Sequence, residues 1–196
     1  DIDTSAEVGI TIANTDVYFV ISSVDLAMSF LYAYNGMELT NVSNGLITGV
    51  VSQGNVIGVS LTSCSNMVIQ GGAYEPYYFG MPDFTSNAYI GLLVQYCNNI
   101  DIVDVINGDD IYYYIYNTFG IYVTDSTDVS ISNCNIVMTM EGICVNSCTG
   151  VTVDGVTAQW NGWNGIDVRN SNDVQITETI TTNNGNNGVF LFNDTI

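Results

Sequence analysis

The chain has no histidine and no lysine, and its only basic side chain is Arg169, against 20 acidic residues, for a formal net charge of −19. A nucleic-acid binder needs basic side chains to displace counterions from phosphates, so this composition argues against that class and against docking on an anionic membrane surface. Without histidine there is no Ser-His-Asp or Cys-His pair and no imidazole metal site. Without lysine there is no Schiff base and no Walker-type phosphate loop.

Long apolar runs are also lacking, since no stretch approaches the roughly 18 residues of a membrane-spanning helix, and we expect no membrane insertion. The chain is 196 residues long and 47% hydrophobic, which is enough for one sizeable core. We therefore expect a single domain over residues 1–196. The start at Asp1, without a methionine or a basic segment, is compatible with a mature product after removal of a signal peptide, and equally with a trimmed chain.

What the sequence does contain is a repeat of about 22 residues. Each copy opens with glycine and an apolar-x-apolar triplet, followed by a polar turn and a second triplet, as in Gly165–Val168 and Val174–Ile176. The opening glycines are Gly9, Gly36, Gly58, Gly91, Gly120, Gly142, Gly165 and Gly188. The period is too short for a strand–helix crossover, and the alternation is that of strands with one buried face. The pattern predicts an all-β solenoid of about eight coils.

These repeats resemble the right-handed parallel β-helix repeats of pectate-lyase-like and NosD-like proteins, over roughly residues 8–192. The resemblance implies that each coil pairs in parallel with the next, around stacks of aliphatic side chains. The residues six positions after each glycine would then form one corner column, namely Val42, Cys64, Cys97, Ser126, Cys148 and Ser171.

Three insertions interrupt the repeat, near residues 24–34, 73–88 and 107–118, and the first reads as a short helix. The other two fall at the same place in the coil and are rich in tyrosine, so stacking would join them into one aromatic lobe. Its tyrosines could stack on sugar rings or pack against a neighbouring subunit, and we favour packing because tyrosine is enriched at interfaces. The candidates for assembly or glycan contact are Tyr77, Tyr78, Tyr112, Tyr114, Tyr116, Tyr122 and Phe190.

Enzymatic activity is not expected, and we assign no catalytic residue. The resemblance implies lyases that use an arginine or lysine base with calcium, and hydrolases that use clustered aspartates with a histidine and a basic pair. Arg169 stands alone, and Asp109 and Asp110 echo only the aspartate motif. No metal site is expected either. Calcium is the one cofactor left open, as a weak alternative through aspartates expected at exposed positions, namely Asp101, Asp125, Asp128, Asp167 and Asp173.

The five cysteines are an odd number, so if the others are oxidised one stays free or pairs with another chain. Cys64 and Cys97 fall on adjacent coils, within disulfide range if the column stacks, or they remain reduced in the core. Cys134 and Cys148 are also expected in the core, with pairing left open. Cys144 occupies the second strand position, a column expected to point outward, and is our candidate for an intermolecular disulfide; the alternative is a tolerated surface thiol.

The sequence as a whole favours a secreted structural protein at the cell surface. The last coil has no recognisable cap, and an uncapped strand edge with outward Tyr122 and Phe190 invites association with further copies. Asn41 and Asn193 match the N-glycosylation pattern. The character of the chain resembles sheath and surface-layer proteins of methanogenic archaea, and we expect a homopolymer that forms a sheath, layer or filament with intermolecular disulfides. The alternatives are a carbohydrate-binding or carbohydrate-degrading β-helix with surface glycans as partners, or a viral fibre or adhesin.

Overall fold

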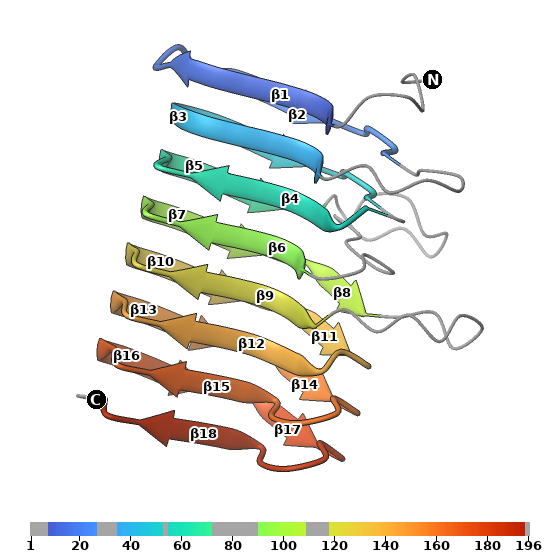
Figure 1. The fold of residues 1–196 in the computed structure, drawn as a ribbon, viewed down its shortest axis with the longest axis vertical. Coiled ribbons are helices and arrows are strands. Elements are labelled where there is room, and N and C mark those ends of the chain that lie inside the picture. Colours follow the sequence, from blue (N-terminus) through green and yellow to red (C-terminus); the bar gives the residue numbers. More distant parts are fainter. Residues whose placement is uncertain (1–7, 27–34, 53–54, 72–89, 109–117, 195–196) are drawn as a thin grey trace.

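The computed structural model describes residues 8–26, 35–52, 55–71, 90–108 and 118–194. Within these ranges every regular element is a β-strand and every strand pairing is parallel. The chain winds through three sheet faces in each complete coil, and successive coils stack along one axis (Figure 1). This arrangement confirms the all-β parallel β-helix that the repeat predicts.

The strands fall on three faces of the rod, and β3 turns the corner between the first two. The first face contains β1 (Val8–Thr15), the first half of β3 (Asn35–Thr48), β4 (Ile57–Thr62), β6 (Ile90–Gln95), β9 (Phe119–Thr124), β12 (Glu141–Asn146), β15 (Ile166–Arg169) and β18 (Val189–Phe192). The second face contains β2 (Phe19–Ser22), the second half of β3, β5 (Ser65–Gln70), β7 (Asn98–Val103), β10 (Thr127–Ser132), β13 (Thr149–Asp154) and β16 (Asn172–Thr177). The third face contains β8 (Ile106–Gly108), β11 (Asn135–Val137), β14 (Thr157–Gln159) and β17 (Ile180–Thr182).

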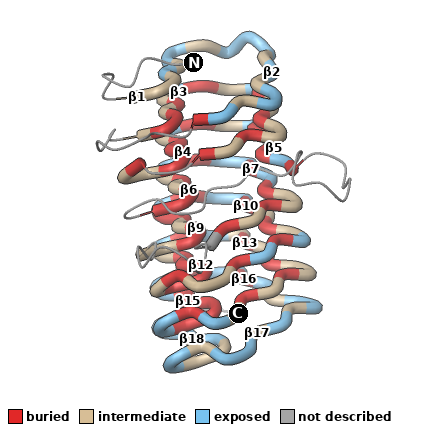
Figure 2. Tube along the Cα trace, turned by 90° about the vertical axis from the view of Figure 1, so that its right-hand side faces the viewer, coloured by how far each residue is buried: buried red, intermediate tan, exposed pale blue. Residues whose placement is uncertain are grey.

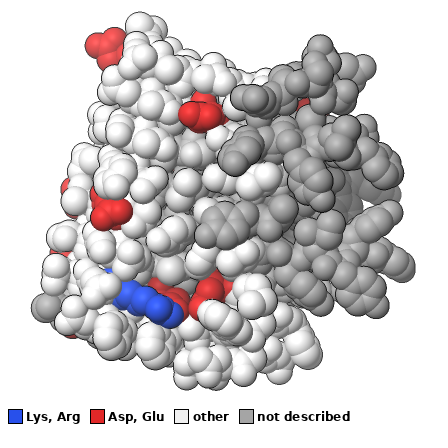
Figure 3. Space-filling view, in the orientation of Figure 1, with Lys and Arg blue, Asp and Glu red and all other residues white. Residues whose placement is uncertain are grey.

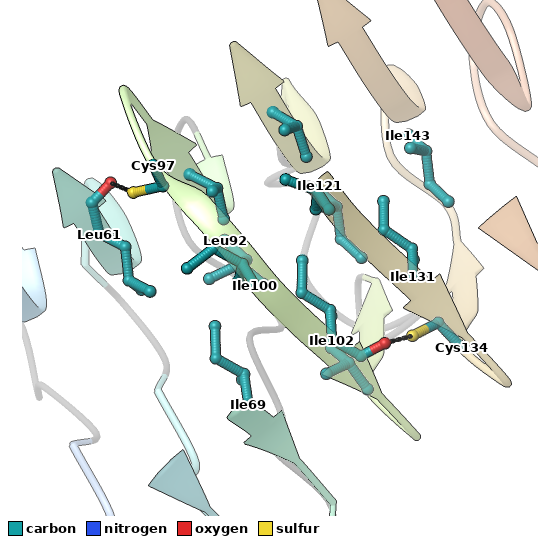
Figure 4. Close-up of a cluster of buried hydrophobic side chains, with 14 of the residues drawn as sticks. Leu61, Ile69, Leu92, Cys97, Ile100, Ile102, Ile121, Ile131, Cys134 and Ile143 are labelled. Atoms are coloured by element: carbon teal, nitrogen blue, oxygen red, sulfur yellow. Dashed lines mark hydrogen bonds between the residues drawn. The ribbon is translucent and has the colours of Figure 1, made fainter. Parts of the chain in front are cut away.

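The core is a set of aliphatic columns in strict register. On the first face Ile121 pairs with Ile143, which pairs with Ile166, and all three are fully buried. On the second face Ile102 pairs with Ile131 in the same way. Figure 2 shows the buried positions, in red, recurring from coil to coil, and Figure 4 shows the isoleucine and leucine side chains packed between the faces. The alternation of the repeat therefore marks the interior correctly.

The recurring glycine is required by the close approach of the coils. A Cβ atom added at Gly120 would lie 2.6 Å from the carbonyl oxygen of Gly142, the equivalent glycine of the next coil. The same 2.6 Å contact separates a Cβ at Gly36 from the oxygen of Gly58. No real side chain tolerates such a distance, so the first strand of each coil can stack on its neighbour only if this position has no side chain.

Short polar residues form the corner between the first and second faces. Asn44, Asn66, Asn99, Asp128 and Asp173 occupy one corner position with φ between 52° and 63°, the left-handed region that Asn and Asp enter more readily than other residues. Along this corner Asn66 donates to the side-chain oxygen of Asn44 (3.3 Å), and Asn99 donates to that of Asn66 (2.9 Å). The polar turns of the repeat are therefore structural corners with their own hydrogen bonds along the axis.

The expected insertions lie largely outside the described residues. Residues 27–34, 72–89 and 109–117 are not described, so the short helix and the aromatic lobe stay predictions. At the approximate start of the third insertion, Asn107 and Gly108 belong to β8, and Asn107 is fully buried.

Candidate functional site

A cluster of polar side chains gathers on the outer surface of the first face, across β12 and β15. Arg169 and Asp167 lie on β15, Glu141 and Cys144 on β12, and Asn164 immediately precedes the glycine that opens the β15 coil. Arg169 is the only basic residue of the sequence. In Figure 3 the basic atoms, in blue, lie against carboxylates, in red, near the C-terminal end of the rod.

Arg169 and Asp167 form a bidentate ion pair. The Nε and Nη2 atoms of Arg169 each donate to one carboxylate oxygen of Asp167 at 2.7 Å. Two residues apart on a strand, the side chains point to the same side of the sheet. The hydrogen bond to Asp167 raises the pKa of Arg169 above its already high value, so Arg169 stays positively charged around neutral pH.

Glu141 is a buried carboxylate in contact with this pair through Asn164. The backbone N–H of Asn164 donates to Oε2 of Glu141 (3.1 Å), and the side-chain amide donates to Oε1 (3.3 Å) and to Asp167 (3.0 Å). Asn164 is held in turn by Asn187, whose backbone and side-chain N–H groups both donate to its oxygen. Burial, and secondly the charge of Asp167, raise the pKa of Glu141, so this carboxyl group takes up a proton at a higher pH than an ordinary exposed glutamate does.

Two adjoining hollows flank these residues and share Glu141, Trp163 and Arg169 in their walls. One has a volume of about 420 Å³ and is lined also by Phe119, Tyr122 and Cys144; the other, of about 580 Å³, is lined also by Asn164, Asn186 and Phe190. We call the two together the Arg169 groove. A molecule that enters it meets aromatic rings, amides and one guanidinium group.

The aromatic side chains of the groove are arranged around the ion pair. Phe119 and Tyr122 stack with ring centroids 4.8 Å apart and planes inclined by 18°. The guanidinium carbon of Arg169 lies 5.4 Å from the centroid of Phe190, in a cation–π contact. Trp163 is 54% exposed and leaves ring surface open to solvent.

The expectation that Cys144 is a surface thiol is wrong. Cys144 does occupy the outward column, between Tyr122 and Asp167 in register, but only 7% of it is exposed. Burial raises the pKa of its thiol to about 12. Asp167 was likewise expected at an exposed position and is 1% exposed, because Arg169 and Asn164 cover its carboxylate. Outward direction from the strand and exposure to solvent are different properties here.

The other four cysteines are buried free thiols, and Cys144 is free as well, so no disulfide forms within the chain. For Cys64 and Cys97 the sequence leaves a disulfide and reduced core thiols both open; in the structure they are two buried free thiols, and the N–H of Cys64 donates to Sγ of Cys97 at 3.3 Å. Cys97 approaches the carbonyl oxygen of Leu61, and Cys134 that of Ile102, as the dashed lines in Figure 4 show. The core location expected for Cys134 and Cys148 is confirmed by exposures of 2% each.

Two of the seven candidates for assembly or glycan contact, Tyr122 and Phe190, line the Arg169 groove. Tyr77, Tyr78, Tyr112, Tyr114 and Tyr116 lie outside the described residues, as do Asp109 and Asp110. Tyr122 and Phe190 are partly buried in the groove walls.

The two glycosylation candidates are both exposed at corners of the rod. The side-chain amide of Asn41 donates to Asn14 (2.9 Å), and that of Asn193 donates to Asn170 (2.9 Å). Attachment of a glycan would replace one of the two hydrogens on each of these nitrogen atoms, so modification and the corner hydrogen bonds involve the same amide groups.

Sequence reasoning did not single out Glu141, Asn164 or Trp163. A signal was present for the ion pair, because opposite charges two residues apart on a strand face the same side. Glu141 and Asn164 share the position just before the opening glycine in successive coils, and this column could have been compared in the same way as the others.

The described ranges contain no group of three or more metal-ligating side chains. In the same part of the chain there is no helix of the length and apolarity that crossing a bilayer requires.

Comparisons with known proteins agree with the fold. The family model of the right-handed β-helix region matches residues 119–195. The solved structure of the periplasmic alginate epimerase AlgG is 12% identical, with a TM-score of 0.60, over 82% of this chain and 47% of that chain. The A-module of the Azotobacter vinelandii mannuronan C-5 epimerase AlgE4 is 18% identical, with a TM-score of 0.56, over 93% of this chain and 54% of that chain.

No curated protein sequence matches the chain significantly. The chain spans about half the length of these two epimerase structures, and at such identities the likeness concerns the fold alone. The comparisons therefore identify a right-handed β-helix region over residues 119–195, within a chain that has the fold of the β-helix epimerases.

Proposed function

We propose that the protein is an extracellular structural protein, a rod that associates with copies of itself into a cell-surface sheath, layer or filament and catalyses no reaction. The observation that carries this proposal is the continuity of the hydrogen-bonded columns along the rod axis. Backbone pairing joins each coil to the next, and columns of side chains repeat the connection at the corners.

The corner column shows how the coils are joined by side chains. The N–H of Cys97 donates to Oγ of Ser126 (3.0 Å), and the N–H of Cys148 donates to Oγ of Ser171 (3.1 Å) in the following coil. At another corner Asn161 accepts from Thr139 of the preceding coil and donates to Asn184 of the next. Such repeated axial bonds suit a rod that has to resist mechanical or chemical stress.

Lateral association is supported by apolar side chains on the outside of the rod. Tyr96 and Trp160 are 59% and 57% exposed, and Val17 and Tyr18 of the first coil are more exposed still. Aromatic and aliphatic groups of this kind favour protein–protein contact. Because the five cysteines are buried, the proposal rests on non-covalent contacts and does not include intermolecular disulfides.

The proposal is tested by measuring assembly of the purified protein. We expect oligomers by sedimentation and ordered tubes, sheets or filaments by electron microscopy, unchanged by reductant. Added salt or mild acid should promote assembly, because the net charge of −19 makes copies repel one another. Single rods at all concentrations and salt conditions would contradict the structural proposal.

A further inference from the structure

We propose that the Arg169 groove is a binding site for an uncharged saccharide. This inference concerns a ligand site on the side of the rod and does not depend on whether the rod assembles. It rests on three features of the groove: an open aromatic face, polar groups on both sides of it, and a charge balance that excludes other ligand classes.

The aromatic face is supplied by Trp163, whose ring is half-exposed at the junction of the two hollows. Its backbone is fixed on both sides, because its N–H donates to the oxygen of Met140 (2.8 Å) and its own oxygen accepts from Asn186 (2.7 Å). An exposed indole on a fixed backbone beside a hollow suits the C–H face of a sugar ring. Binding there would bury apolar surface of both partners at low conformational cost.

Polar groups flank that ring along the groove. The Nε and Nη2 atoms of Arg169 are occupied by Asp167, which leaves Nη1 to donate to a ligand hydroxyl. Asn186 lines the larger hollow and Asn146 the smaller one, and each side-chain amide can donate and accept. Together the hollows offer about 1000 Å³, room for more than one sugar ring.

The charge balance selects an uncharged ligand. The charge of Arg169 is already balanced by Asp167, and Glu141 adds a carboxylate whose raised pKa reflects an environment unfavourable to negative charge. A uronate would bring another carboxylate into this environment and into the field of a chain with net charge −19. The ammonium group of an amino sugar would find no open carboxylate partner, because both oxygens of Asp167 accept from Arg169, both oxygens of Glu141 accept from Asn164, and both acidic residues are buried.

The experiment is a titration of the purified chain with oligosaccharides, followed by tryptophan fluorescence and calorimetry. The probes are oligomers of glucose, mannose, xylose and N-acetylglucosamine, compared with oligogalacturonate and with oligomers of glucosamine. We expect at least one uncharged oligomer to bind, and oligogalacturonate and glucosamine oligomers to bind at least about tenfold more weakly or not at all.

Two tryptophans provide a matched pair of variants. Trp163→Ala should weaken binding by about tenfold or more, whereas Trp160→Ala, which removes an equally exposed tryptophan outside the groove, should leave it unchanged. Asn186→Ala, at an exposed position, should weaken binding without affecting the fold. Absence of binding by all uncharged oligomers, tighter binding of a charged one, or equal effects of the two tryptophan variants would overturn the proposal. Failure of assembly would have no bearing on it.

Discussion

Arg169 binds both carboxylate oxygens of Asp167, so the only basic side chain of the chain is used to neutralise a carboxylate that is 1% exposed. Charged partners of this kind are costly to separate, because the remaining group stays buried without compensation. With Asn164 and Glu141, the pair ties the coil of β15 to that of β12.

Arg169→Met should lower the free energy of unfolding by about 2 kcal/mol, because it leaves Asp167 buried without its ion pair. The partial exposure of Arg169 keeps the loss below that of a fully buried pair. Urea denaturation measures the change. The double variant Arg169→Met/Asp167→Asn should recover part of the loss, and Asp173→Asn, at an exposed corner, serves as control. A single variant as stable as the parent would refute the structural role of the pair.

Glu141 should make stability depend on pH. Its pKa is raised in the folded chain, so the folded state holds the proton more tightly than the unfolded state does. Stability is therefore lost as the pH rises from the unfolded value of about 4.3 through the folded pKa, and is constant above it. Glu141→Gln should remove this component from unfolding curves measured between pH 4 and 8, whereas Glu178→Gln, at an exposed position, should not. Identical pH profiles for Glu141→Gln and the parent would contradict the assignment.

Asn161→Ala should destabilise the rod by about 1–3 kcal/mol, because the backbone N–H and the hydroxyl of Thr139 lose their common acceptor inside the molecule. Thermal or urea unfolding gives the difference from the parent. Asn172→Ala replaces an exposed asparagine on β16 and provides the comparison. If the two variants were equally stable, the hydrogen bonds of Asn161 between coils would contribute nothing measurable to the free energy of unfolding.

Gly142→Ala should be severely destabilising, by about 3 kcal/mol or more, because the new methyl group collides with the carbonyl oxygen of Gly165 in the next coil. Gly162→Ala is the matched control, since its methyl group would meet only the sulfur of Met140 at 3.3 Å, and a methionine side chain can move. Circular dichroism and the yield of folded protein distinguish the two. A well-folded Gly142→Ala chain would mean that adjacent coils can separate.

The five cysteines should resist alkylation in the native state. All are buried, and burial raises the pKa of Cys134 and of Cys144 to about 12, so neither forms the reactive thiolate near neutral pH. The side-chain hydrogen bond with Cys97 lowers the pKa of Cys64 to about 7, so the protection of Cys64 rests on its burial, with only 2% of it exposed. Mass spectrometry after maleimide treatment should show an unmodified chain under native conditions and five labels after denaturation. Rapid labelling of Cys144 in the folded protein would restore it as a candidate for cross-linking.

The fold could be predicted from the sequence because its rules are local and repeated. Each coil repeats a glycine, an apolar-x-apolar strand and a polar corner. The glycine allows the coils to stack closely, the strand supplies the core side chains, and the corner turns the chain. Exposure of the outward column could not be predicted, because it depends on which neighbours cover it. Cys144 shares its column with partly exposed Tyr122 and Phe190, yet it is buried among groove residues that precede β12 and β15.

The groove was missed for the same reason. The residues that line it come from four successive coils. Three of them occupy the position just before an opening glycine, and this position carries a different residue in each, namely Phe119, Glu141 and Asn164. A repeat pattern draws attention to what stays constant, whereas a binding site is made from positions that vary. Comparing the variable columns coil by coil would have placed Glu141 beside Asn164.

The corner column also gives the rod a direction. The backbone N–H of Cys97 is satisfied by Ser126, that of Cys148 by Ser171, and that of Ser171 by Asp194, always by the coil that follows. At this corner these backbone N–H groups are therefore satisfied by the following coil, whereas the thiols of Cys97 and Cys148 contact carbonyl oxygens of the preceding one. Removal of a coil therefore has different consequences at the two ends of the rod. Loss of the C-terminal coil removes the hydrogen-bond acceptor of a backbone N–H in the preceding coil. Loss of the N-terminal coil leaves the backbone N–H groups of this column satisfied.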